Sequence, residues 1–332
     1  MKAAFYDKTG APDVIQYGEL PKPEPAPGEV RVRVAAAALN PIDVYIRAGT
    51  AKMPLPFPFV PGCDLAGVVD AIGVGVTRYK PGDKVWGSNQ GILGRQGTFA
   101  EFCCAAEEFL YPLPEGVSEQ DAAAAALTGI TAHLGLFGRA DLKAGEMVFV
   151  NGGTGGVGSM VVQMAKAVDA RVVTTVGSAE KAKVATGFGA DRVINYKTED
   201  IATAVLDATG GKGIDVWYET VPPSDFDKTV ELMAPRGRVI VMAGRAARPV
   251  FPNGPFYLKG LSLYGFAMFN CSADEQRQCA DEMNWWLADK KLRPVIGAVM
   301  PLSEAAAAHR LQEENTVGKA GTLTGKIVVV PK

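Results

Sequence analysis

Several residue types and spacings that metal and disulfide sites need are scarce in this sequence. It contains only two histidines, His133 and His309, and neither has a partner at ligand spacing. It has no Cys-x-x-Cys pair, and its five cysteines follow no disulfide framework. We therefore expect no bound metal and no disulfides, and free thiols favour the reducing cytoplasm.

The sequence also lacks an excess of charge of one sign and long apolar runs. The 34 basic residues are offset by 36 acidic ones without a basic stripe, which argues against nucleic-acid binding. No apolar run reaches the length of a membrane span, and no apolar leader is recognisable. The 332 residues, 48% of them hydrophobic, suffice for a cytoplasmic protein of two domains.

The first third of the chain has the pattern of a barrel-like β domain. Residues 28–34 and 66–72 read as strands, and closely spaced Pro, Gly and Asp separate such runs. A helical Ala run over 122–126 marks the change to a different pattern.

From residue 147 onward, short apolar runs alternate with helix-length segments. This alternation predicts an α/β fold with right-handed βαβ units and a parallel sheet covered on both faces. The expected strands are 147–150, 171–176, 192–194, 215–219 and 238–242, and the expected helices are 156–167, 179–187, 201–209 and 225–233. A strand over 260–268, helices over 273–291 and 303–313, and a strand over 325–330 complete the prediction.

The strongest local signal is a glycine-rich segment, Asn-Gly-Gly-Thr-Gly-Gly-Val-Gly over 151–158, between an expected strand and an apolar helix. This context is typical of a dinucleotide site, where main-chain N–H groups at the helix N-terminus hold a pyrophosphate. A P-loop is excluded because no Gly-Lys-Ser/Thr ends the run, and a flexible loop is the alternative. The residues assigned to the cofactor here are Gly152, Gly155, Gly156, Val157 and Gly158.

The next strand indicates which nicotinamide cofactor binds. NAD sites usually have a carboxylate about 20 residues beyond the glycines, but no acid stands at this turn. Ser178 and Lys181 follow it, a hydroxyl and a cation suited to a 2′-phosphate. Glu180 is the counter-argument, and Lys181 and Lys183 are otherwise ordinary exposed residues. We predict NADPH.

The remaining chemistry is hydride transfer without a metal. Cys63 is the only thiol beside an acid, Asp64, and a lone buried Cys is usually a small hydrophobe. No Gly-x-Ser-x-Gly or Cys/His pairing supports covalent hydrolysis. A quinone or an α,β-unsaturated carbonyl delocalises the incoming charge, so hydrogen-bond donors suffice for it.

Taken together, several segments resemble those of a known family. The chain is similar to the zinc-free quinone oxidoreductase branch, which includes zeta-crystallin, of the medium-chain dehydrogenase/reductase superfamily. The segments that carry the resemblance are 38–49, 61–69, 82–85, 97–102, 152–158, 193–196 and 325–328. Zinc-dependent relatives place Cys where this chain has Asn40 and Gly-His-Glu where it has Gly62-Cys63-Asp64.

The resemblance implies roles for individual residues. Asn40 and Tyr45 become candidate catalytic donors, although Asn40 as a brace of its loop and Tyr45 as an aromatic wall are the alternatives. Gly177, Ser178, Lys181 and Tyr196 would hold the adenosine phosphate. The residues implied at the nicotinamide end are Pro41, Ile42, Tyr45, Thr131, Phe266, Ala267 and Met268.

The resemblance also implies the architecture. A GroES-like catalytic domain would comprise residues 1–122 and 268–332, and a Rossmann NADP-binding domain would comprise 123–267. Relatives commonly form homodimers through the strand near 260–268. Two other functions stay open, a zinc-dependent alcohol dehydrogenase and an NADPH-binding sensor or structural protein without turnover.

Overall fold

The structure, a computed structural model, describes residues 1–331 and divides into two compact units. The first comprises 1–127, 276–288 and the chain from 294 onward, and the second comprises 128–275 and 289–293. Two of the four boundaries, 127/128 and 275/276, fall inside helices, α2 (Glu119–His133) and α8 (Ala273–Ala288). The predicted limits of the two functional domains stay a prediction.

The second unit is built on a parallel sheet with strand order β10-β9-β8-β11-β12-β13. The chain proceeds from β8 to β10, returns to β11 beside β8, and continues to β13, so the order reverses between β8 and β11. Doubly wound sheets bind ligands at the carboxyl ends of the strands at this switch point. The strands are β8 (Met147–Asn151), β9 (Arg171–Val176), β10 (Arg192–Asn195), β11 (Ile214–Glu219), β12 (Met233–Val241) and β13 (Ser262–Gly265).

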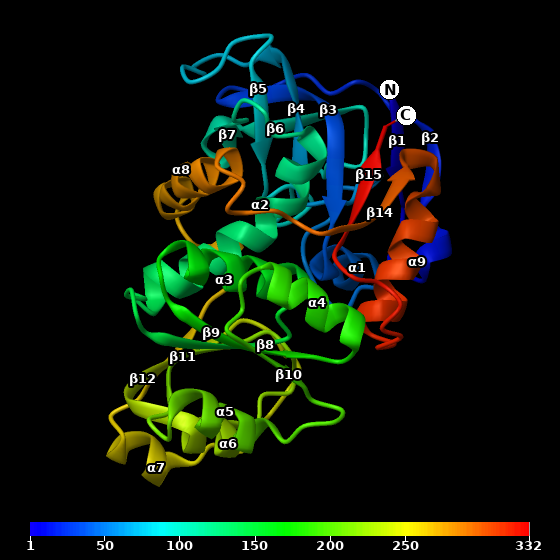
Figure 1. The fold of residues 1–332 in the computed structure, drawn as a ribbon. Helices are drawn as coiled ribbons and strands as arrows, with labels where there is room; N and C mark the ends of the chain where they lie inside the picture. Colours follow the sequence, from blue (N-terminus) through cyan, green and yellow to red (C-terminus); the bar gives the residue numbers. More distant parts are fainter. Residues whose placement is uncertain (332) are drawn as a thin grey trace. The chain divides into compact units, whose positions relative to one another are not determined.

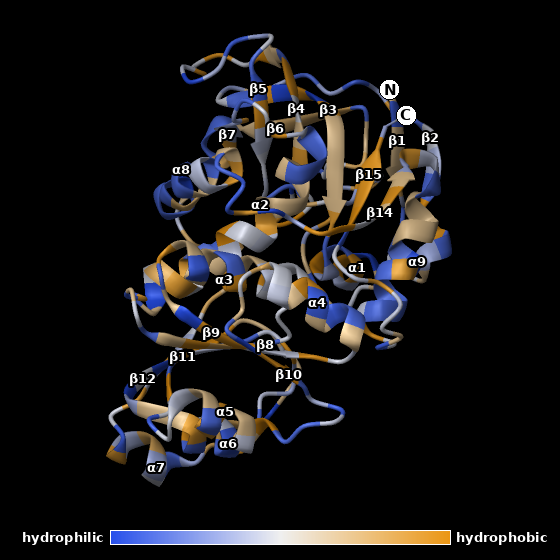
Figure 2. Ribbon diagram, in the orientation of Figure 1, coloured by the Kyte–Doolittle hydropathy of each residue, from blue (hydrophilic) through white to orange (hydrophobic). Residues whose placement is uncertain are grey.

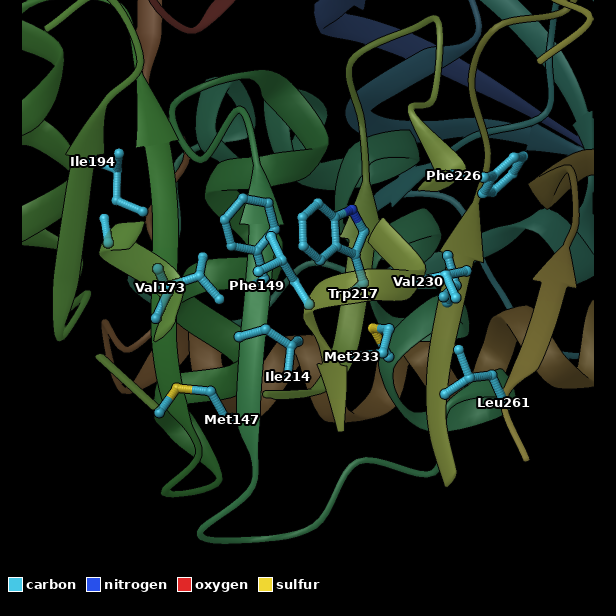
Figure 3. Close-up of a cluster of buried hydrophobic side chains, with 14 residues drawn as sticks. Met147, Phe149, Val173, Ile194, Ile214, Trp217, Phe226, Val230, Met233 and Leu261 are labelled. Carbon is cyan, nitrogen blue, oxygen red and sulfur yellow. The ribbon is translucent and has the colours of Figure 1, made fainter. Parts of the chain in front are cut away.

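Helices cover both faces of this sheet, as the α/β prediction requires. Helices α3 and α4 lie on one face, and α5 and α6 lie on the other (Figure 1). Beneath α5 and α6 the apolar side chains form one cluster, in which the rings of Phe149 and Trp217 stack 3.9 Å apart (Figure 3). The helices are α3 (Gly156–Ala167), α4 (Ala179–Gly187), α5 (Ile201–Thr209), α6 (Phe226–Leu232) and α7 (Asn253–Leu258).

Polar caps determine where three of these helices begin. The side chains of Ser178, Asp200 and Asp225 each accept a hydrogen bond from the main-chain N–H three residues later. Such caps satisfy donors that the first helical turn leaves free and typically contribute about 1 kcal/mol. The predicted helices 179–187 and 201–209 are confirmed at both ends.

The first unit contains a largely antiparallel sheet of order β14-β15-β3-β4-β5-β7, with β6 paired to β3. Strand β3 is longer than predicted, and irregular pairing with β4 bends it so that β4, β6 and β15 all pair with it. Its buried residues are apolar, and so are those of β15 apart from Lys326 (Figure 2). The strands of this sheet are β3 (Glu29–Leu39), β4 (Asp64–Ile72), β5 (Lys84–Gly87), β6 (Phe102–Ala106), β7 (Leu110–Pro112), β14 (Ile296–Pro301) and β15 (Lys326–Val330). Strands β1 (Lys2–Phe5) and β2 (Gln16–Glu19) pair with each other in a separate sheet.

Two further helices belong to the first unit, α1 (Pro41–Arg47) and α9 (Ala305–Thr316). Helix α1 follows β3 directly, with Asn40 at its N-cap and Pro41 at its first position, where a missing N–H costs nothing. Among residues 1–331, no helix is long and apolar enough to cross a membrane.

Candidate active site and cofactor site

The glycine turn lies at the switch point of the second unit. Strand β8 ends at Asn151, Gly152 follows with φ +84°, and α3 begins at Gly156. A Cβ on Gly158 would lie 2.1 Å from the carbonyl oxygen of Gly152, so only glycine allows the helix to start this close to the turn. This contact supports the prediction that Gly158 allows close packing of the helix.

The start of α3 has the properties of an anion site. Its N-cap residue, Gly155, has no side chain to accept from the first N–H groups of the helix. These donors and the positive end of the helix dipole therefore face outward from the carboxyl edge of the sheet. The turn fits a pyrophosphate group, which needs main-chain donors and no bulky side chain.

A second polar corner lies at the ends of β9 and β10. Ser178 caps α4, and a Cβ on Gly177 would lie 2.4 Å from the hydroxyl oxygen of Tyr196. The structure thus brings Gly177, Ser178 and Tyr196 together, with Lys181 in the first turn of α4. Glu180 is solvent-exposed, and hydrogen bonds from its own main-chain N–H and from Ser178 lower its pKa.

Thr131 lies where α2 gives way to a π-helical segment, Leu134–Arg139. The Tyr218 hydroxyl donates to the Thr131 carbonyl oxygen over 2.8 Å. Phe266, Ala267 and Met268 follow β13 directly, at the carboxyl edge of the same sheet. These four predicted residues and the glycine turn therefore belong to the second unit.

In the first unit, Asn40 is completely buried and bonded at both ends of its amide. Its Nδ2 donates to Asp64 Oδ2 over 2.8 Å, and its Oδ1 accepts from Lys326 Nζ. Its main-chain N–H donates to Asp43 Oδ2 over 2.8 Å. Its Nδ2 also donates to the Ala38 carbonyl oxygen over 3.3 Å, so its donors are bonded inside the protein, which supports the alternative that Asn40 braces its loop.

The same buried network includes Cys63 and Asp64. The Cys63 thiol donates to Asp43 Oδ1 over 3.2 Å, and Asp64 Oδ1 accepts from Ser88 Oγ over 2.7 Å. Lys326 Nζ lies 3.8 Å from Asp64 Oδ2. Burial raises the pKa of Asp43 to about 7, raises that of Cys63 well above its ordinary value, and lowers that of Lys326.

Tyr45 contrasts with Asn40. It is half-buried on α1, burial raises its pKa, and its hydroxyl has no hydrogen-bond partner in the part of the chain that the structure describes. Pro41 and Ile42 occupy the first turn of the same helix and are exposed and half-buried. Of the two predicted donors, only Tyr45 keeps its donor free.

No metal centre is recognisable among residues 1–331, where no group of three His, Cys, Asp or Glu side chains is arranged to hold an ion. His309 is buried against Phe99, and burial lowers its pKa to about 3. Sequence reasoning missed three polar residues of the second unit that are hydrogen-bonded beneath the glycine turn. They are the half-buried Asn151 and the buried Thr175 and Glu219.

Known proteins are similar to this chain over its full length. An alcohol dehydrogenase GroES-like domain model matches residues 26–115, and a zinc-binding dehydrogenase model matches residues 156–285. The quinone oxidoreductase of Sus scrofa is 34% identical over 331 residues, with 99% of this chain and 98% of that protein covered. A 2-haloacrylate reductase from a Burkholderia species is 30% identical, with 99% of both covered. A structure of Escherichia coli quinone oxidoreductase complexed with NADPH matches all of both chains at a TM-score of 0.86 and 27% identity.

Proposed function

Since the chain belongs to the quinone oxidoreductase family of the medium-chain dehydrogenase/reductase superfamily, we propose that it uses NADPH to reduce quinones and α,β-unsaturated carbonyls without zinc. The observation that carries the proposal is the bare glycine turn at the switch point between β8 and β11. The relative named 2-haloacrylate reductase supports the extension to conjugated acceptors, because a haloacrylate has a double bond conjugated with its carboxyl group.

NADPH supplies the hydride when it is bound. The N–H groups around Gly155 and Gly156 would hold its pyrophosphate, and Gly152, Val157 and Gly158 would shape the turn. The Ser178 hydroxyl, the Lys181 ammonium and the Tyr196 hydroxyl would hold the 2′-phosphate beside Gly177. The residues proposed for the nicotinamide end are Pro41, Ile42, Tyr45, Thr131, Phe266, Ala267 and Met268.

Tyr45 is the proposed donor to the acceptor. Its free hydroxyl would stabilise the oxygen on which negative charge develops, and solvent would then protonate the resulting anion. Asn40 is the proposed positioning residue, because its bonds to Asp43, Asp64 and Lys326 fix the start of the helix that carries Tyr45.

The donor set around Asp64 supports a mechanism without zinc. Both carboxylate oxygens of Asp64 already accept hydrogen bonds, and the cation beside them is the Lys326 ammonium. The neighbouring thiol of Cys63 is also bonded inside the protein, where it donates to Asp43 Oδ1.

The test is oxidation of NADPH by 1,4-benzoquinone and by a 2-alkenal, each with and without a chelator. We expect both acceptors to be reduced at rates that the chelator does not change. Tyr45→Phe should lower kcat/KM for the alkenal by roughly a hundredfold and for the quinone by about tenfold, because the quinone delocalises the incoming charge over a larger π system than the alkenal does. Tyr17→Phe, on an exposed tyrosine of β2, is the matched control.

Two outcomes would contradict parts of the proposal. If neither acceptor, nor a wider panel of enones, oxidises NADPH, the proposed reaction is wrong. If the purified protein contains stoichiometric zinc and loses its activity with the metal, the zinc-free mechanism is wrong and the alcohol dehydrogenase alternative is favoured.

We also propose a cytoplasmic homodimer. All five cysteines are free thiols, which supports a reducing compartment. Strand β13 is the last strand of its sheet, and Leu263 and Tyr264 on it are exposed. A second copy that pairs with this edge would cover both the apolar side chains and the unpaired main chain.

A further inference from the structure

A chain of hydrogen bonds lies beneath the first glycine of the turn and crosses three neighbouring strands. The N–H of Gly152 donates to Thr175 Oγ1 over 2.9 Å, and that hydroxyl donates to Asn151 Oδ1 over 2.7 Å. Asn151 Nδ2 in turn donates to Glu219 Oε1 over 2.9 Å. Thr175, Asn151 and Glu219 come from the carboxyl ends of β9, β8 and β11.

The carboxylate at one end determines the direction of every bond in this chain. An ionised Glu219 only accepts, so the Asn151 amide must present its NH2 group to it and its oxygen to Thr175. The Thr175 hydroxyl must then donate to Asn151, which leaves its oxygen lone pair for the Gly152 N–H. Without an acceptor at Glu219 the amide has no preferred orientation.

A second contact of the same carboxylate reaches the other side of Gly152. The Val221 N–H donates to Glu219 Oε1 over 2.8 Å, and a Cβ on Gly152 would lie 2.8 Å from Val221 Cγ2. One oxygen of Glu219 therefore holds both the hydrogen-bond chain and the residue that packs against the glycine.

The carboxylate itself is firmly held. Glu219 is 4% exposed, and its Oε2 accepts from the indole N–H of Trp217 over 3.3 Å. Trp217 stacks on Phe149 in the core cluster (Figure 3). Packing of the sheet thus fixes the position of the carboxylate, and the carboxylate in turn fixes the conformation of the glycine turn at Gly152.

We propose that Glu219 is a positioning residue for the cofactor, which orients Asn151 and Thr175 so that Gly152 adopts the conformation that receives the pyrophosphate. The inference rests on the proposed function, because it takes the turn at 152–158 to be the NADPH site. Glu219 bonds to Asn151, Trp217 and Val221, and it would act on the cofactor through Asn151, Thr175 and the main chain of Gly152.

The test measures NADPH dissociation constants of variants at the two ends of the chain. Glu219→Gln replaces one of the two carboxylate oxygens by an NH2 group, so either the Asn151 donor or the Trp217 donor loses its acceptor. Thr175→Val removes the acceptor of the Gly152 N–H. We expect each to weaken NADPH binding by roughly tenfold and kcat at saturating NADPH to change by less than about threefold. Because both interrupt one chain, the double variant should bind only about as weakly as either single variant.

Thr209→Val is the matched control. The Thr209 hydroxyl is also buried in the second unit and also accepts from a glycine, the N–H of Gly213, over 3.3 Å, but it lies at the end of α5. We expect it to lower the thermal midpoint and leave NADPH binding unchanged.

The inference would be overturned if folded Glu219→Gln or Thr175→Val protein had an NADPH dissociation constant within twofold of the wild-type value. It would also be overturned if the two substitutions had fully additive effects on NADPH binding. If Glu219→Gln does not fold, Thr175→Val decides the question alone. Wild-type protein that binds NADPH but reduces no quinone contradicts only the proposed reaction, because the role of Glu219 is measured by binding.

Discussion

The carboxyl group of Asp43 titrates near neutral pH because folding removes it from water. Its pKa rises to about 7 in the folded protein, whereas an ordinary Asp titrates near about 4. Between those values the folded protein keeps a proton that the unfolded chain has released. The free energy of unfolding therefore falls as the pH rises through this window.

We expect Asp43→Asn to weaken that dependence. The amide keeps an oxygen that accepts from the Asn40 N–H but carries no charge to bury at high pH. Urea unfolding at about pH 5 and about pH 8 should show the wild type losing roughly 1–2 kcal/mol more than the variant. Asp64, Cys63 and Lys326 are present in both proteins, so equal losses would contradict the assignment of this slope to Asp43.

Lys181 should determine the preference for NADPH over NADH. Its side chain is available for a 2′-phosphate, while the bond from its main-chain N–H to Ser178 survives substitution. We expect Lys181→Ala to lower kcat/KM for NADPH by roughly tenfold and to leave the value for NADH unchanged. Lys183→Ala, on an exposed lysine of the same helix, is the control. Equal losses with both cofactors would show that Lys181 does not contact the phosphate.

At the scale of elements, the sequence predicted correctly the bounds of those helices and strands that are determined by residues within the segment itself. Strand β9 and helices α3, α4 and α5 have the predicted bounds, because periodicity and caps or glycines at their starts lie within each segment. The prediction was wrong at Met233, which begins β12 instead of ending a helix. Arg236 has φ +64°, and the pairing of β11 with β12 is irregular at this point. Strand β12 therefore starts before Pro235 and Gly237, two residues that in the sequence indicate a turn rather than a strand.

Elements that depend on tertiary partners could not be predicted from the sequence. Strand β14 exists by pairing in parallel with β15, and the π-helical turn after α2 accompanies the Tyr218 bond to Thr131. The glycine turn could be recognised because its strand, turn and helix are contiguous. Glu219 could not, since its pairing with Asn151 depends on strand order and register.

The close approach of α3 to its turn leads to a prediction for Gly158. A methyl group there would lie 2.1 Å from the Gly152 carbonyl oxygen, so the helix start must move away from the turn. We expect Gly158→Ala to weaken NADPH binding by more than about tenfold, as measured by fluorescence titration.

Gly187 offers the matched control for this substitution. It ends α4 without positive φ, and a Cβ there has no neighbour within 4 Å. Gly187→Ala should leave NADPH binding unchanged and raise the free energy of unfolding by about 0.5–1 kcal/mol, because alanine is the better helix former. Unaltered NADPH binding by Gly158→Ala would show that the turn tolerates the displacement.

At the scale of the whole molecule, the edge strand β13 combines an unpaired main chain with exposed apolar side chains. Strand β13 pairs with β12 and with no other strand of residues 1–331. Exposed apolar side chains gather in the segment that leads into it and on the strand itself. They are Val250, Tyr257, Leu258, Leu263 and Tyr264, exposed by 36% to 76%. An apolar open edge of this kind is a template for pairing with another strand.

The dimer proposal can be tested at that edge. Leu263→Lys places a charge beside the main chain that a second copy of β13 would pair with, at the cost of little buried area, since Leu263 is 41% exposed. Light scattering should give the mass of a dimer for the wild type and of a monomer for the variant. Val74→Lys, on a residue 82% exposed in the first unit, should stay dimeric. The charge should prevent the dimer because a charged edge strand resists pairing. A wild-type monomer would contradict the dimer, and a Leu263→Lys dimer as stable as the wild type would place the interface elsewhere.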